Sequence, residues 1–207
     1  MAIHCNRAST RLPKALILIA ACAVSTWASA HTGVDGAHSA SFMTGFLHPM
    51  FGLDHLAAML AVGVWSALVA RHAGRELLWG PLGFANLLLV GALLGLEGVA
   101  LPAVEPMIAA SLLVIGLLVV TRLRLPGAAS ALLVGIFAVF HGVAHGLELA
   151  ESASAFQTLA GMLTATVLLH AAGLALGWSL RGVNVWVGRF VGAVLAVFGT
   201  VLLTQLA

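Results

Sequence analysis

The sequence predicts an all-α, polytopic membrane protein with six transmembrane helices after a cleavable N-terminal signal peptide. Its 207 residues are 61% hydrophobic and only 8% charged, whereas soluble domains carry about 25% charged residues. Six apolar segments follow one another with short polar breaks, and each is near the length of about 20 residues that a helix needs to cross a bilayer. The small net charge of +2 argues against a nucleic-acid partner, so the lipid bilayer is the expected environment.

The first 30 residues have the pattern of a secretory signal peptide. Arg7, Arg11 and Lys14 form a basic region, residues 15–24 are an apolar run, and residues 28–30 (Ala-Ser-Ala) form a small-x-small cleavage site. The apolar run is too short to cross a bilayer about 30 Å thick. We therefore expect cleavage after Ala30, which leaves residues 31–207 as one transmembrane domain.

Two alternatives for this segment stay open. It is retained as an uncleaved helix through Trp27, or Cys22 in the lipobox-like stretch at 19–22 becomes a lipidated terminus. Both cysteines, Cys5 and Cys22, lie within the segment. A chain cleaved after Ala30 therefore has no thiolate, and any metal site in it must use His, carboxylate, Met, amide or backbone ligands.

The apolar segments should be helical because lipid offers no hydrogen-bond partners to bare backbone. We expect the helices at 54–70, 77–96, 104–121, 128–149, 156–179 and 185–205. The segment 41–53, with Gly45, Pro49 and Gly52, is predicted to be a broken or re-entrant start to the first helix. Six spans divide as three plus three, and the two halves then run in opposite directions, which would suit an inverted repeat.

Charge predicts the orientation. The six cations beyond the signal segment follow the first, third and fifth helices: Arg71, Arg75, Arg122, Arg124, Arg181 and Arg189. The positive-inside rule makes these loops cytoplasmic and the mature N terminus periplasmic, in a bacterial inner membrane. Six of the acids fall at or near the outer side, which favours either a cation-attracting vestibule or ordinary loop solvation.

Two histidine clusters are candidates for function, because ionisable groups inside a bilayer are costly. In the first, His48 and His55 flank Pro49 and Gly52, and Asp54 is either a ligand or the N-cap of the following helix. In the second, three side chains project from one helix face over two turns: His141, His145 and Glu148.

The predicted topology places both clusters near the outer ends of their helices, in the same leaflet. Imidazole and carboxylate groups suit divalent transition metals, so the sequence permits one composite metal site formed by His48, Asp54, His55, His141, His145 and Glu148. His170 lies deeper in the fifth helix, either as a further station on a metal path or as a buried hydrogen-bonding residue. His31 and His38 in the outer tail are weaker candidates for metal capture.

Residues 48–65 resemble the signature of the HupE/UreJ family of nickel permeases. The segment reads His-Pro-x-x-Gly-x-Asp-His-Leu-x-Ala-Met and continues to Val62-Gly63-Val64-Trp65, and a His-Gly-x-x-His-Gly-x-Glu element begins at His141. The resemblance implies secondary transport of nickel, linked to hydrogenase or urease maturation, with the six residues of the composite site as metal ligands. It leaves cobalt open as the substrate.

The expected function is therefore that of a permease that carries a divalent transition metal into the bacterial cytoplasm. Nickel is the expected metal, and cobalt is the alternative. We expect no enzymatic activity and no prosthetic group, with Ni²⁺ (or Co²⁺) as the transported substrate. An intramembrane zinc-dependent hydrolase is the alternative, since His and carboxylate groups also suit catalytic zinc, although no His-Glu-x-x-His pattern is present. A haem-binding electron carrier is a third possibility.

Overall fold

The computed structural model describes residues 41–206. The predicted signal peptide, the lipobox alternative at Cys22, and the candidate ligands His31 and His38 lie outside this range, so they stay predictions.

The described residues form helices and no strand. In chain order the elements are α2 (Phe42–Phe51), α3 (Leu53–Val69), η1 (Arg75–Leu77), α4 (Trp79–Leu96), α5 (Val104–Thr121), α6 (Gly127–Leu149), α7 (Ala155–Leu180) and α8 (Val185–Gln205). Five of them, α4 to α8, are long and apolar enough to cross a membrane, and α2 with α3 is a bent pair that makes a sixth when the two helices are taken as one span. The expectation of a polytopic all-α membrane protein is confirmed.

The bend between α2 and α3 lies at Gly52. The two helices meet at 80°, and Gly52 has an extended backbone with φ −74° and ψ 108°. Its N–H donates to the carbonyl of His48 at 3.0 Å, and its carbonyl accepts from the N–H of Leu56 at 2.8 Å. The expected break is confirmed, but Pro49 lies inside α2 and does not end it.

Of the two alternatives for Asp54, the N-cap is wrong, because the N-cap residue of α3 is Gly52. Asp54 lies within the first turn of α3, and its carboxylate instead accepts a hydrogen bond from the ring of His55.

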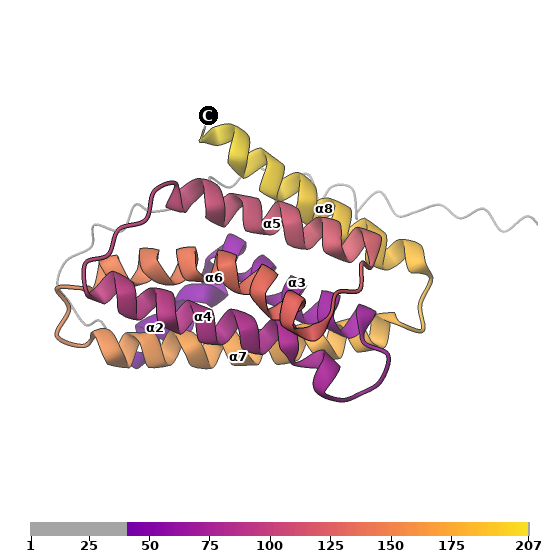
Figure 1. The fold of residues 1–207 in the computed structure, drawn as a ribbon, viewed down its shortest axis with the longest axis horizontal. Coiled ribbons are helices and arrows are strands. Elements are labelled where there is room, and N and C mark those ends of the chain that lie inside the picture. The colour runs from indigo at the N-terminus through magenta and orange to yellow at the C-terminus, as the bar shows by residue number, and fades with distance from the viewer. Residues whose placement is uncertain (1–40, 207) are drawn as a thin grey trace, which may run out of the picture. The chain divides into compact units, whose positions relative to one another are not determined.

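The long helices pack in three close pairs, α3 with α7, α4 with α6 and α5 with α8, while α2 rests on α7 (Figure 1). Glycines allow these backbones to approach. A methyl group at Gly142 of α6 would collide with the carbonyl oxygen of Leu88 on α4. Small residues at helix contacts are typical of membrane proteins, since packing there drives association.

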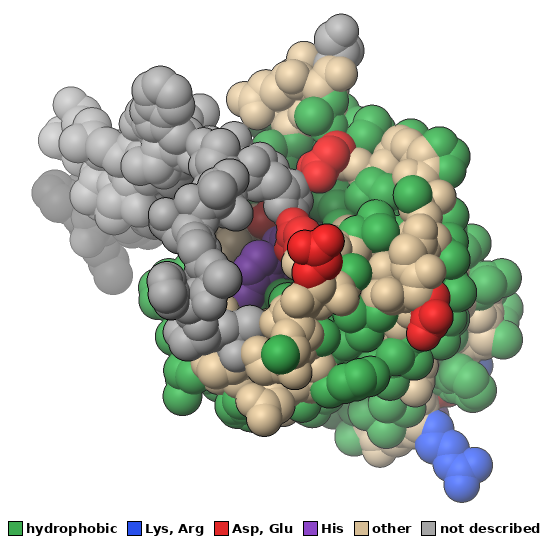
Figure 2. All heavy atoms as spheres, turned by 90° about the vertical axis from the view of Figure 1, so that its left-hand side faces the viewer, with side chains coloured by type: hydrophobic (Ala, Val, Ile, Leu, Met, Phe, Trp, Pro, Cys, Tyr) green, Lys and Arg blue, Asp and Glu red, His purple; other side chains and the backbone are tan. Residues whose placement is uncertain are grey.

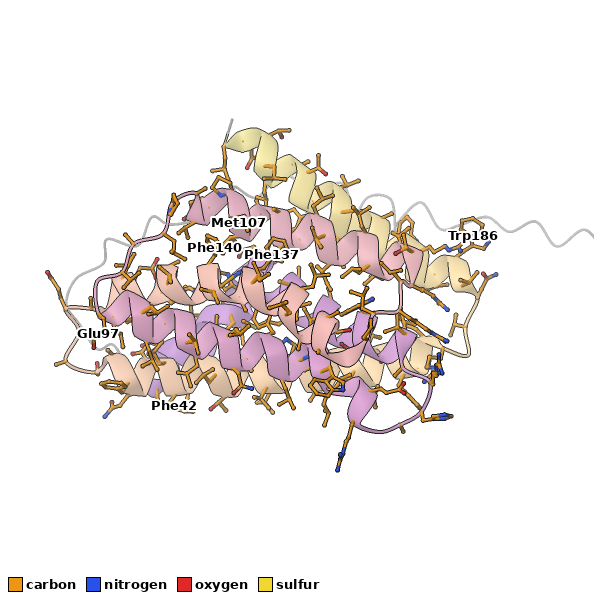
Figure 3. The ribbon with its side chains drawn as sticks, viewed as in Figure 1. Phe42, Glu97, Met107, Phe137, Phe140 and Trp186 are labelled. Atoms are coloured by element: carbon orange, nitrogen blue, oxygen red, sulfur yellow. The ribbon has the colours of Figure 1, made fainter. Side chains whose placement is uncertain are left out.

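The two ends of the described helices differ in charge. The six arginines among the described residues follow α3, α5 or α7 in the chain, and Arg189 lies inside α8 rather than in the loop before it. At the opposite end Glu97 caps α4 and Glu105 lies in the first turn of α5. Figure 3 shows Glu97 and Trp186, near the start of α8, at these two opposite ends.

Candidate metal centre

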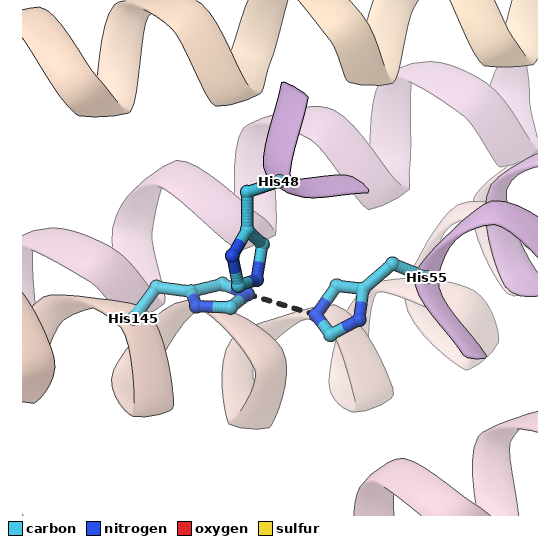
Figure 4. A group of neighbouring side chains, drawn as sticks. All are labelled: His48, His55 and His145. Atoms are coloured by element: carbon cyan, nitrogen blue, oxygen red, sulfur yellow. Dashed lines mark hydrogen bonds between the residues drawn. The ribbon is translucent and has the colours of Figure 1, made fainter. Parts of the chain in front are cut away.

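Three imidazole rings from three helices meet near the acidic end. His48 of α2, His55 of α3 and His145 of α6 each offer a ring nitrogen, and these atoms lie within 4.8 Å of one another. The Nε2 atoms of His55 and His145 are 2.9 Å apart (Figure 4). The ring of His48 stands nearly perpendicular to both, with interplanar angles of 81° and 85°.

The bend at Gly52 explains why His48 and His55 face the same space. In a continuous helix, residues seven apart lie two turns apart along the axis. The 80° turn brings the end of α2 back beside the first turn of α3, so that the two ring centroids are only 5.2 Å apart. His145 completes the group from the last two turns of α6.

A carboxylate lies behind each of two imidazoles. Asp54 Oδ1 is 2.9 Å from Nδ1 of His55, and Glu148 Oε2 is 3.3 Å from Nδ1 of His145. An ionised carboxylate only accepts hydrogen bonds, so each Nδ1–H donates and each neutral ring keeps its lone pair on Nε2. Metal-binding histidines are commonly oriented by a carboxylate in this way. Asp54 and Glu148 therefore fix the orientation of the two imidazole rings.

The cluster is buried, but its rim is not. His55 and His145 are 5% and 4% exposed, whereas the Glu148 side chain is 45% exposed. Figure 2 shows Asp and Glu side chains on this face, close to histidine. The two Nε2 atoms lie at hydrogen-bond distance, 2.9 Å, so the rings can share one proton or one cation between them.

His141 borders the cluster without joining it. It is 1% exposed, its Nδ1–H donates to the carbonyl of Phe137 at 3.0 Å, and its ring centroid is 5.4 Å from that of His55. Its Nε2 is buried without a hydrogen-bond partner among the described residues. Five of the six predicted ligands thus form one connected group, and the sixth lies directly beside it.

His170 is deeper, on α7, and is 2% exposed. The alternative of a buried hydrogen-bonding histidine is not what the structure shows, because neither ring nitrogen has a partner in the described part of the chain. Its ring meets the ring of Phe84 edge-on at 5.2 Å, and Phe84 in turn lies 5.9 Å from His141. Sequence reasoning missed Phe84, since a Phe in an apolar helix looks like any core residue.

These features define a polytopic membrane protein with a histidine–carboxylate cluster buried between its spans. The chain belongs to the HupE/UreJ family: the family model described as "HupE / UreJ protein" matches residues 19–202. It is also 40% identical over 188 residues to Protein HupE of Rhizobium leguminosarum bv. viciae, an alignment that covers 89% of this chain and 94% of that protein. No solved structure matches the chain.

Proposed function

We propose that this protein is a permease that carries a divalent transition metal, nickel in particular, into the bacterial cytoplasm. The observation that carries the proposal is the pair of Nε2 atoms from His55 and His145, which lie 2.9 Å apart with a carboxylate behind each ring. Imidazole nitrogens are good ligands for Ni²⁺, and His48 supplies a third within reach.

The spacing of the two nitrogens is compatible with the coordination geometry of nickel. With metal–nitrogen bonds of about 2.0–2.1 Å, two nitrogens 2.9 Å apart subtend about 90° at the ion. That is the angle between neighbouring ligands in square-planar or octahedral geometry, of which the former is characteristic of Ni²⁺ and Cu²⁺. A tetrahedral zinc would need a separation of about 3.3 Å with the same bond lengths.

Charge supports inward movement. The arginine-bearing loops are assigned to the cytoplasm by the positive-inside rule, so the acidic end faces outward. A dication that crosses from the acidic end then gains about 4.6 kcal/mol for each 100 mV of membrane potential. By family resemblance, we propose that the imported nickel supplies hydrogenase or urease maturation.

Uptake of radioactive nickel by cells that express the protein tests this function. We expect the wild type to accumulate nickel, and Asp54→Ala and His141→Ala to lose most of that uptake at equal expression. Unlabelled cobalt in excess shows whether the two metals share the site. Uptake no greater than in cells without the protein would contradict the proposal.

A further inference from the structure

The pairing of α3 with α7 and that of α6 with α4 have the same register. A methyl group built on Gly63 of α3, or on Gly142 of α6, would first meet the backbone of the paired helix. For Gly63 the three nearest atoms are His170 O, Leu174 N and Gly173 C; for Gly142 they are Leu88 O, Ala92 N and Gly91 C. The atom types and their spacing along the paired helix are the same.

The reverse contacts repeat this register. Two glycines of α7 and two of α4 face a carbonyl oxygen of the paired helix: Gly173 faces Leu60, Gly91 faces Val139, Gly177 faces Val64 and Gly95 faces Val143. The same number of residues separates the matched positions of α3 and α6: Gly63 and Gly142, Leu60 and Val139, and Val64 and Val143. A second constant number of residues separates the matched positions of α4 and α7.

In the third pair, α5 with α8, each helix makes the same contacts with the other. A methyl group on Gly116 of α5 would meet Gly192 O and Ala196 N of α8, and a methyl group on Gly192 would meet Gly116 O and Val120 N. The exchange of α5 for α8 therefore reproduces the contacts between these two helices, whereas α5 packs more closely on α3 and α6 than α8 does. Because equivalent helices are three spans apart in chain order and successive spans alternate in direction, equivalent helices run in opposite directions across the bilayer, as in transporters with inverted repeats.

We propose that α3–α5 and α6–α8 are inverted repeats, and that a cavity at the arginine end is the counterpart of the histidine cluster and the vestibule through which the hydrated dication leaves. Ser66 follows Gly63 by three residues, as His145 follows Gly142. The repeat therefore places Ser66 at the position of His145, at the opposite end.

Ser66 lines a cavity of about 380 Å³ at that end. The side chain is 3% exposed, and its hydroxyl has no hydrogen-bond partner among the described residues. At about 30 Å³ for each water, the cavity has room for roughly twelve waters, which is enough for an ion with its first hydration shell. The lining also includes Arg71, Glu76 and Arg124.

The inner cavity offers weaker metal ligands than the histidine cluster, as release of the ion requires. Where the outer end presents three imidazoles, the described lining of the inner cavity has two hydroxyls (Ser66 and Ser130), one carboxylate and two arginines. Glu76 Oε2 already accepts a hydrogen bond from the backbone N–H of Arg71 at 2.8 Å. Such a set binds a dication weakly, because the arginines repel it and few oxygens replace its water. This inference rests on the proposed function and deepens it.

Cysteine labelling tests the cavity without any measurement of transport. Ser66→Cys and Val69→Cys place thiols in its lining. Gly74→Cys, with open space around it, and Val99→Cys report the two faces of the membrane. Val90→Cys, on the exposed apolar side of α4, is the lipid-facing control. Membrane vesicles of both orientations are treated with a membrane-impermeant thiol reagent, and labelling is measured above that of the unsubstituted chain.

We expect Ser66→Cys or Val69→Cys to react only from the face on which Gly74→Cys reacts, while Val90→Cys stays unlabelled. No reaction at either cavity position, or reaction from the Val99→Cys face, would overturn the vestibule. A second variant, Ser66→Leu, fills the cavity and should lower nickel uptake at least tenfold while nickel bound per purified chain is unchanged. Full uptake by a folded Ser66→Leu variant would also overturn it. If the chain moves no nickel at all, the proposed function fails while the labelling result still stands.

Discussion

His55 on α3 and His145 on α6 bring their Nε2 atoms to 2.9 Å although 90 positions separate them in the chain. Each ring is held from behind by a carboxylate, that of Asp54 for His55 and that of Glu148 for His145. The two Nε2 atoms face each other, and the ring of His48 stands nearly perpendicular to that of His145.

Loss of either facing imidazole should abolish tight binding. We expect His55→Ala and His145→Ala each to weaken nickel binding by purified protein more than about 100-fold, beyond what loss of an orienting partner costs. Equilibrium dialysis measures the effect. His72→Ala is the matched control, since His72 is exposed in the loop after α3 and should bind as the wild type does. Equal affinity of His145→Ala and His72→Ala would rule the site out.

The carboxylate of Asp54 should matter through His55. Asp54→Asn keeps the size of the side chain but removes the charge that fixes the Nδ1–H of His55. We expect nickel affinity to fall about 10–100-fold, less than for the loss of His55 itself. Glu76→Gln, which removes the acid at the opposite end, serves as the control in the same binding assay. An Asp54→Asn variant with wild-type affinity would contradict the orienting role.

His170 should show opposite effects on stability and transport. Its two ring nitrogens are buried without partners among the described residues, and an unsatisfied buried polar group costs about 1–3 kcal/mol. His170→Leu should therefore raise the unfolding temperature in detergent while nickel uptake falls and binding at the outer cluster persists. A more stable variant with full uptake would remove His170 from the metal path.

The close contact of α4 with α6 should be sensitive to a single methyl group. Gly142→Ala forces a Cβ against the backbone of Leu88, and overpacking of this kind costs about 1–3 kcal/mol. Gly74→Ala is the comparison, because nothing lies within 4 Å of the added methyl. Thermal unfolding of both variants measures the difference. Equal stability of the two would show that the α4–α6 contact is looser than described.

The spans and the meeting of the two clusters could be predicted from sequence, because apolar length sets helices and the placement of arginines sets their direction. Both histidine clusters then fall at one depth. The role of each residue inside the site could not be predicted. Asp54 at the start of a helix has the pattern of an N-cap, and only the bend at Gly52 shows that its carboxylate holds His55 instead.

Other features of the site depend on packing that no single motif encodes. Phe84 lies between His141 and His170 because α4 approaches α6 closely through Gly91, Gly95 and Gly142. Ser66 resembles any small residue in a membrane helix until its place relative to Gly63 is matched with that of His145 relative to Gly142. Both relationships come from the register between helices.

X-ray absorption by the purified, nickel-loaded protein is the most direct measurement of whether imidazoles from separate helices hold one ion. We expect at least two imidazole rings in the outer-shell scattering around nickel, with one fewer in His145→Ala. A wild-type spectrum that shows oxygen ligands without imidazole rings, or one that His145→Ala leaves unchanged, would contradict the proposed site.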